Sequence, residues 1–235
     1  MCGRYTLSSP ADLIADLFGL TEMPELALRF NIAPTQEAPV VRVRREAGVP
    51  GTAGRRRLDL LRWGLIPFWA DDPRIGNRMI NARAESIATK PAFRRSYEKR
   101  RCLVVTDGFY EWQKVGGGGK QFYRIHRCDD RPFAFAGLWD CWYDRGAGGD
   151  APPLSSFTIV TTDASPEIAG IHDRMPVVVD PADYDLWLDP SLADRERLEA
   201  LLRPNAADLE AYPVSRLVNS PDNDAPECVL PVNAE

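Results

Sequence analysis

The second residue of the chain is a cysteine, and this position gives it unusual chemical potential. Removal of Met1, which is usual before a small residue, would leave Cys2 with a free α-amine and a thiol on adjacent carbons. Such a pair can attack a carbonyl twice from one residue. If Met1 stays, Cys2 could instead begin an edge strand and pack as a small apolar side chain. This residue alone leaves both explanations open.

Three further residues have side chains that could move protons or hold a polar ligand. Glu111 lies among aromatic residues in an expected strand, where burial would raise its pKa; a half-exposed surface glutamate is the alternative. His172 could exchange protons near neutral pH, although a structural histidine is the more common explanation. The other histidine, His126, is expected on an exposed strand face. Asn81 offers an amide that both donates and accepts, or else a turn or helix cap.

Charge is distributed unevenly along the chain. The net charge is −5, but residues 29–101 carry +10, residues 102–235 carry −12 and residues 1–28 carry −3. A basic segment of this kind favours an anionic partner, with phosphate as the first candidate. The alternative is a solvated surface that the acidic half balances after folding. Aromatic residues alternate with arginines in the basic segment, as in stacking platforms for unpaired bases or in an ordinary core: Trp63, Phe68, Trp69, Arg74, Arg78 and Arg83.

Length and composition indicate an ordinary globular protein. The 235 residues are 44% hydrophobic and 27% charged, which favours a single domain over residues 2–235. The sequence has no apolar run long enough for a membrane helix and no signal-peptide pattern. Its five cysteines include no CxxC pair, which favours reduced thiols and a cytoplasmic location. Because no metal-ligand spacing or phosphate-binding loop occurs either, we expect no cofactor and no metal.

The expected elements indicate an α+β fold with a largely antiparallel sheet or barrel. A helix is expected after Ser8-Ser9-Pro10, and an amphipathic helix over 192–202. Residues 108–114 and 121–127 should form a hairpin across the glycines at 116–119. Further strands are expected over 38–44, 58–63, 102–106, 133–139, 157–162 and 175–179.

Seven motifs occur in the order found in the SOS response-associated peptidase (SRAP) family, which the chain closely resembles. They span nearly the whole sequence: MCGRY at 1–5, RFNIAP at 29–34, RWGLIPFW at 62–69, INARAES at 80–86, DGFYEW at 107–112, IHDRMPV at 171–177 and PVSRLVN at 213–219. The resemblance implies a compact α+β domain around a barrel-like, mostly antiparallel sheet with flanking helices and a positively charged groove.

The resemblance also implies a function. Family members are sensors of abasic sites in single-stranded DNA and attach to them covalently through the mature N-terminal cysteine. By motif position, Cys2 would be the nucleophile and Asn81 would position the amine or the opened sugar. Glu111 would handle protons during imine formation, and His172 would assist ring opening and reversal. Phosphate contacts would come from Arg4, Arg83 and Arg174, and stacking from Trp69 and Trp112. The protein would act as a monomer.

The chemistry implied by the resemblance is consistent with the residues. The α-amine would attack the ring-opened aldehyde to give an imine, and the thiol would then close a five-membered thiazolidine. Two segments fit less well: residues 68–78 contain two adjacent acids that would repel phosphate, and the arginine-rich loop 47–57 matches no motif. Alternatives are a thiol peptidase or autoprotease, an N-terminal-nucleophile amidotransferase, and a DNA-binding module without catalysis.

Overall fold

The computed structural model describes residues 2–44, 54–146, 152–205 and 208–233. The strands are β1 (Tyr5–Leu7), β2 (Arg29–Ile32), β3 (Glu37–Arg44), β4 (Arg55–Trp63), β5 (Asn81–Arg83), β6 (Arg101–Thr106), β7 (Gly108–Lys114), β8 (Lys120–Arg127), β9 (Phe133–Trp142), β10 (Leu154–Asp163), β11 (Arg174–Pro176), β12 (Val178–Val179) and β13 (Leu209–Val214). The α-helices are α1 (Ala11–Phe18), α2 (Arg94–Lys99), α3 (Pro166–Ala169), α4 (Tyr184–Leu188) and α5 (Arg195–Ala200). The 3-10 helices are Pro73–Arg78, Ala84–Ser86, Gly116–Gly118, Pro181–Asp183, Arg216–Asn219 and Pro226–Val229.

A closed barrel forms the centre of the molecule. Strand β10 pairs with β4, β4 with β3, β3 with β6, β6 with β9, and β9 again with β10, which closes the ring. Among the pairings described, those of β10 with β4 and with β5 are parallel and the others are antiparallel. The predicted α+β fold with a barrel-like, mostly antiparallel sheet is therefore confirmed.

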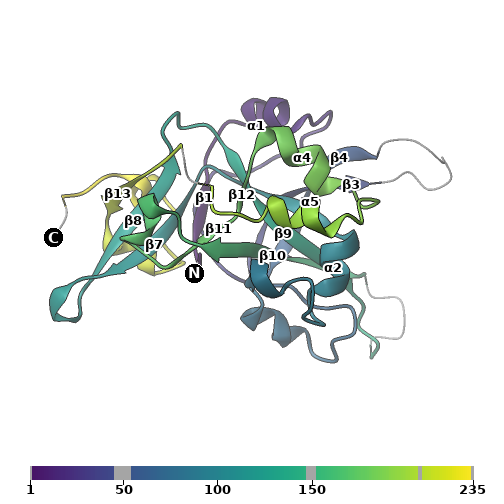
Figure 1. The fold of residues 1–235 in the computed structure, drawn as a ribbon. Coiled ribbons are helices and arrows are strands. Elements are labelled where there is room, and N and C mark those ends of the chain that lie inside the picture. The colour runs from purple at the N-terminus through teal and green to yellow at the C-terminus, as the bar shows by residue number, and fades with distance from the viewer. Residues whose placement is uncertain (1, 45–53, 147–151, 206–207, 234–235) are drawn as a thin grey trace.

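A second, five-stranded sheet lies beside the barrel, in the order β13-β8-β7-β1-β2 (Figure 1). The predicted hairpin of β7 and β8 is present, with Lys114 opposite Lys120 at its tip. Strand β1 also attaches to the barrel, because the Tyr5 ring packs edge-on against Trp63 and Phe135 at centroid distances of 5.1 and 6.2 Å. The first strand thus belongs to the second sheet and packs against the barrel through Tyr5.

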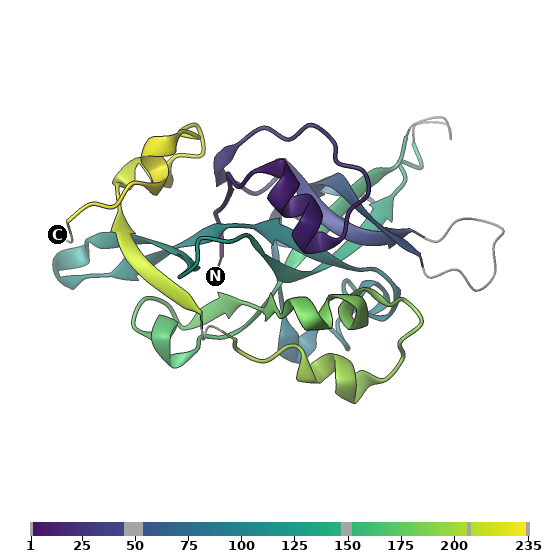
Figure 2. The same ribbon diagram turned by 90° about the horizontal axis from the view of Figure 1, so that it is seen from above.

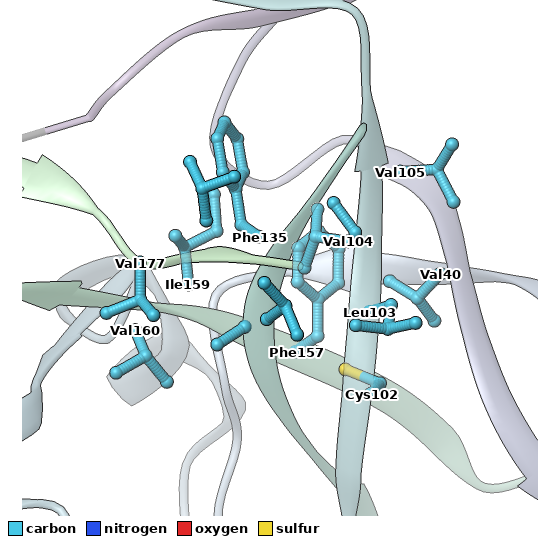
Figure 3. Close-up of a cluster of buried hydrophobic side chains, with 14 of the residues drawn as sticks. Val40, Cys102, Leu103, Val104, Val105, Phe135, Phe157, Ile159, Val160 and Val177 are labelled. Atoms are coloured by element: carbon cyan, nitrogen blue, oxygen red, sulfur yellow. The ribbon is translucent and has the colours of Figure 1, made fainter. Parts of the chain in front are cut away.

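The hydrophobic core fills the barrel. Strand β6 is buried at all six positions, as expected for the run RCLVVT, whose branched apolar residues favour strands. Figure 3 shows how the side chains of β6 meet those of the neighbouring barrel strands, Val40 of β3, Phe135 of β9 and Phe157 of β10. Burial of this apolar cluster supplies most of the driving force for folding.

Helices α2 and α4 cover the outside of the barrel next to β6. The indole of Trp187 in α4 donates to the carbonyl oxygen of Cys102 at 2.8 Å. The buried guanidinium of Arg101 satisfies carbonyl groups at the ends of both helices, including those of Tyr97 and Trp187, each at 2.6 Å. Such bonds are needed because the last carbonyl groups of a helix lack partners inside it.

Two predicted elements differ from the structure. The helix expected over 192–202 covers only Arg195–Ala200, because the side chain of Asp194 accepts from the Arg197 amide and caps its start. The strand expected over 175–179 is divided at Val177. There the Val177 amide donates to Val160 in β10, whereas its carbonyl oxygen accepts from Ala136 in β9. The chain changes neighbours at that residue.

Candidate active site

The N-terminal end of the chain lies where the two sheets meet, in the middle of the molecule (Figures 1 and 2). Cys2 is completely buried, and its thiol donates to the carbonyl oxygen of Arg4 at 3.6 Å. The Tyr110 amide donates to the same carbonyl at 3.0 Å, which continues the pairing of β1 with β7 toward Cys2. Burial, reinforced by the nearby carboxylate of Glu111, raises the pKa of the thiol well above its usual range. The thiol is therefore neutral at physiological pH.

Asn81 contacts Cys2 directly. Its side-chain Nδ2 donates to the Cys2 carbonyl oxygen at 2.7 Å. The segment that leads to Asn81 is tied to the barrel, because Ile80 accepts from the Trp63 indole at 2.9 Å. Close contact between Gly64 and Gly76 also holds this segment: a Cβ on Gly64, whose φ is +120°, would lie 2.5 Å from the Gly76 carbonyl oxygen.

Glu111 lies on β7 opposite Tyr123 of β8 and is 1% exposed. Burial raises its pKa to about 7, and the negative charge of Asp173 acts in the same direction. A carboxyl group with this pKa is present in both protonation states near neutral pH, so it can donate a proton and take one back. Of the two alternatives that the sequence leaves open for Glu111, the structure shows the buried one.

His172 lies between α3 and β11, in a loop that is tied to β7. Gln113, two residues beyond Glu111 on the same strand, donates to the Gly170 carbonyl oxygen at 2.7 Å. Burial lowers the pKa of His172, so its imidazole is neutral at pH 7. Its Nδ1 accepts from the Arg174 amide at 3.0 Å, which leaves the proton of the neutral ring on Nε2. Asp173 Oδ1 lies 2.8 Å from Nδ1 and would stabilise the protonated ring.

The three predicted phosphate-binding arginines occupy different environments. Arg4 is half-buried, and its guanidinium donates to the carbonyl oxygens of Gly3 and Asn219 at 3.2 and 3.3 Å. Arg83 is exposed on β5. Arg174 is buried, and its Nη1 donates to Glu85 and Asp163 at 2.9 and 2.7 Å.

Arg83 and Arg174 line the same open cavity, of about 390 Å³, which Lys90 and Ser86 also border. Its two carboxylates, Glu85 and Asp163, are the partners of Arg174. Arg174 is therefore held in place, and Arg83 and Lys90 are the exposed cations of the cavity.

The predicted stacking residues are only partly accessible. Trp69 is 40% exposed in the loop after β4. Trp112 is half-buried next to Glu111 and packs edge-on against Phe122 at 5.9 Å. The acids that would repel phosphate are partly neutralised, since Asp72 pairs with Arg74 at 2.7 Å.

Other sequence-based expectations have mixed outcomes. The expectation that His126 is exposed is wrong: it is 6% exposed, because β13 covers it and places Glu210 3.3 Å from its Nε2.

Many charges of the basic segment are balanced within the fold, as in the pair of Arg56 with Asp185 at 2.6 Å. Residues 47–53 of the arginine-rich loop lie outside the described residues.

One residue of the site, Gln113, did not stand out in the sequence. Gln113 follows Glu111 at the two-residue spacing that places side chains on one face of a strand, which is the signal that could have identified it. Asp173 is adjacent to His172, but only the fold places it near Glu111. Within the described ranges, no three side chains of His, Cys, Asp or Glu are grouped to hold a metal ion, and no described helix is long and apolar enough to span a membrane.

Comparisons with known proteins agree with this architecture. The chain is 40% identical over 233 residues to the abasic site processing protein YoqW of Bacillus subtilis, covering 97% of this chain and 99% of that protein. It is 32% identical to the abasic site processing protein HMCES of Gallus gallus, covering 99% of this chain and 78% of that one. A crystal structure of a protein from Bacteroides thetaiotaomicron matches with a TM-score of 0.81 and 26% identity over 99% of this chain and 100% of that one. The model of the SOS response associated peptidase (SRAP) family matches residues 1–221, and the chain belongs to this family.

Proposed function

We propose that this protein recognises abasic sites in single-stranded DNA and links to them covalently through Cys2 after Met1 is removed. The observation that carries the proposal is the grouping of a buried cysteine with an amide and a proton-exchanging carboxyl group. Asn81 holds the Cys2 backbone at 2.7 Å, and Glu111 is close enough to raise the pKa of the thiol. The relatives named abasic site processing proteins support the substrate class.

The first step opens the sugar. An abasic deoxyribose exists mainly as a closed hemiacetal, which has no free aldehyde to attack. Ring opening moves the hydroxyl proton of the anomeric carbon to the ring oxygen. The protonated form of His172, which Asp173 stabilises at Nδ1, can give its Nε2 proton to the ring oxygen as the ring opens, and the neutral imidazole can then take the hydroxyl proton back on Nε2.

The second step forms the imine. The α-amine of Cys2, with a reference pKa of about 7.7–8.0, is partly neutral at pH 7 and adds to the aldehyde carbon. Loss of water from the resulting carbinolamine requires a proton on the departing hydroxyl group. Protonated Glu111 donates it, which leaves an iminium ion next to a carboxylate.

The third step closes the ring. The thiol sulfur bonds to the iminium carbon, the carbon–nitrogen double bond becomes single, and the thiol proton passes to the Glu111 carboxylate. One water is released overall, and Glu111 returns to its starting state. Because amine and thiol belong to the same residue, the second addition is intramolecular and gains the corresponding effective molarity.

The proposal is tested with single-stranded DNA that carries one abasic site, analysed by denaturing electrophoresis. We expect a covalent band with the wild-type protein and none with Cys2→Ala. Cys128→Ala is the matched control, since Cys128 is an exposed thiol outside the site and its removal should leave the band intact. Mass spectrometry of the wild-type protein should show Cys2 as the first residue.

Three outcomes would contradict the proposal: an equal band from Cys2→Ala, retention of Met1 in crosslinked protein, or no band at all with the wild type. Peptide or glutamine hydrolysis that depends on Cys2, in the absence of any DNA band, would favour the peptidase or amidotransferase alternative.

A further inference from the structure

A second surface rich in aromatic and arginine side chains lies at the end of the barrel remote from Cys2. It consists of Phe68, Arg95, Arg100 and Tyr143, and we call it the Phe68–Tyr143 surface. Phe68 is 39% exposed and Tyr143 is 60% exposed, among the most exposed large apolar side chains of the described residues. Neither belongs to the hydrophobic core clusters, so packing alone gives no reason for two aromatic rings here.

Three segments bring these residues together and hold them in place. The guanidinium of Arg95, from α2, lies 4.1 Å from the centre of the Phe68 ring. The Phe68 amide, in the loop after β4, donates to Asp140 Oδ2 of β9 at 3.0 Å. Arg100 forms an ion pair with the other oxygen of the same carboxylate. Tyr143 directly follows β9, three residues after Asp140. The surface is therefore built around one buried carboxylate.

The position of the surface relative to Cys2 follows from strand β10. Trp142, which precedes Tyr143, pairs with Leu154 at the start of β10. Asn81, which binds the Cys2 backbone, pairs with Ile159 of the same strand. Leu154 and Ile159 are five residues apart in an extended strand, so about 17 Å separates them. The Phe68–Tyr143 surface and the Cys2 site are therefore held at a fixed spacing by one strand.

We propose that the Phe68–Tyr143 surface binds an unpaired base of the same DNA strand, a few nucleotides away from the nucleotide at Cys2. This inference rests on the proposed function and adds a second, noncovalent subsite to it. An aromatic ring with a guanidinium on one face offers a stacking surface to any base, because every base has a π-face. Stacking of this kind would hold the strand without reading its sequence.

The side chains of the surface itself carry positive charge, whereas exposed acids lie beside it in the sequence, Asp71 three residues after Phe68 and Asp144 next to Tyr143, so the surface is suited to stacking a base rather than to binding a phosphate. The carboxylate of Asp140 is 2% exposed and already paired with Arg100, so it offers no repulsion to a phosphate. Arg94, next to Arg95 in α2, is exposed and adds a further positive charge. Aromatic rings bordered by arginines are the combination that single-stranded nucleic acid sites use.

The test measures covalent bond formation as a function of DNA length. Single-stranded oligonucleotides carry one abasic site with a minimal flank on one side, and between about 4 and about 16 nucleotides on the other, the span of known single-strand sites. Both polarities are used. The proteins are wild type, Phe68→Ala, Tyr143→Ala and Arg95→Gln. Matched controls are Leu230→Ala, which removes an apolar side chain that is 55% exposed elsewhere, and Arg203→Gln, which removes an exposed arginine.

For one of the two polarities, we expect the DNA concentration that the wild type needs for covalent bond formation to fall as the flank lengthens. The three variants should lose about fivefold or more of that gain, the effect of removing one stacked base, yet react like wild type with the shortest oligonucleotide. Arg203→Gln and Leu230→Ala should keep the full length dependence. Melting temperatures of all variants check that each protein folds.

The outcomes separate this proposal from the proposed function. If no DNA becomes linked at any length, the proposed function fails. The proposal of a second subsite fails if the wild type reacts without any dependence on flank length, or if all three variants keep the wild-type dependence. In either case the proposed covalent chemistry is unaffected. Equal losses with the shortest oligonucleotide would also overturn it, because they would indicate general damage to the site. Protection of Phe68 and Tyr143 from labelling by a protein partner but not by DNA would assign the surface to protein binding instead.

Discussion

At the scale of single residues, the site depends on groups whose protonation differs from that in water. Burial keeps the Cys2 thiol neutral, raises the pKa of Glu111 to about 7 and lowers that of His172. Each shift has the same physical origin, since a poorly solvated charge is unfavourable. In the proposed reaction, Cys2 would be a nucleophile that loses its thiol proton, Glu111 the carboxyl group that takes it, and His172 the group that moves protons on the sugar.

Glu111 should make folding stability depend on pH. Because its pKa is higher in the folded than in the unfolded chain, the neutral carboxyl favours folding below about pH 4.5. That contribution is lost as the pH rises through about 7. We expect Glu111→Gln to gain stability relative to wild type by up to about 3 kcal/mol between pH 4.5 and 8. Chemical denaturation at several pH values measures this, and a pH-independent difference would contradict it.

His172 should act on the rate of the reaction and not on DNA binding. We expect His172→Ala to slow covalent bond formation by about 100-fold or more, the usual contribution of a positioned acid–base group, with noncovalent affinity for intact single-stranded DNA unchanged. His126→Gln is the control, since the other histidine pairs with Asp130 and Glu210 on the far side of β8. Single-turnover rates for both variants decide the matter. Unchanged rates with His172→Ala would remove it from the mechanism.

At the scale of elements, strand β1 determines where Cys2 lies. Asp107, which is 4% exposed, holds the segment after Cys2 by accepting from the Ser8 amide at 2.5 Å and from the hydroxyl groups of Thr6, Ser8 and Ser9. Arg124 lies 3.6 Å from the same carboxylate. This network fixes the first strand next to β7, and with it the distance between Cys2 and Glu111.

Asp107→Asn should weaken the attachment of β1. An amide can accept only part of these bonds and carries no charge, so we expect a loss of about 2 to 3 kcal/mol in the free energy of unfolding. Covalent bond formation should slow as well, because Cys2 is held less firmly. Asp144→Asn, a change at an exposed aspartate in a loop, is the control. A destabilisation of the same size in both variants would show that the network at Asp107 has no special role.

The sequence predicts the helices and strands better than it predicts which residues from distant segments contact one another. The β7–β8 hairpin follows from two alternating runs separated by four glycines, which is a local signal. The interruption at Val177 has no local signal, because it arises from two backbone partners on different strands. Cys2, Asn81 and Glu111 were identified by type and motif. The ion pairs of Arg174 with Glu85 and Asp163 could not be predicted, since these residues meet only when β10, β11 and the 3-10 helix Ala84–Ser86 assemble.

At the scale of the whole molecule, several arginines of the basic segment are paired with carboxylates instead of being free to bind DNA. Arg29 pairs with Asp224, Arg42 with Asp59, and Arg100 with Asp140. A strongly charged surface therefore cannot be inferred from the +10 of residues 29–101 alone. The exposed cations that remain near the site include Arg83 and Lys90 at the cavity beside β5.

Noncovalent DNA binding should weaken with salt, but with a modest slope. Each phosphate contact releases counterions, and log K falls by about 0.7 per contact for each tenfold rise in salt for single strands. Because only a few exposed cations, such as Arg83 and Lys90, lie near the site, we expect two to three phosphate contacts and therefore a slope of about −2. Titrations of Cys2→Ala with single-stranded DNA at several salt concentrations measure it. Arg83→Gln should reduce the slope by about 0.7, whereas Arg203→Gln should not.

The central position of the chain's beginning has a practical consequence for anyone who handles this protein. A purification tag joined ahead of Cys2 would have to leave from a position that is 0% exposed, between the two sheets, and would keep the α-amine in a peptide bond. After the 3-10 helix Pro226–Val229, the chain runs to one end of the molecule (Figure 1). If the protein acts through the Cys2 amine as proposed, tags and fluorophores belong at the carboxyl end, and a preparation that carries an uncleaved leader would form no covalent bond with DNA.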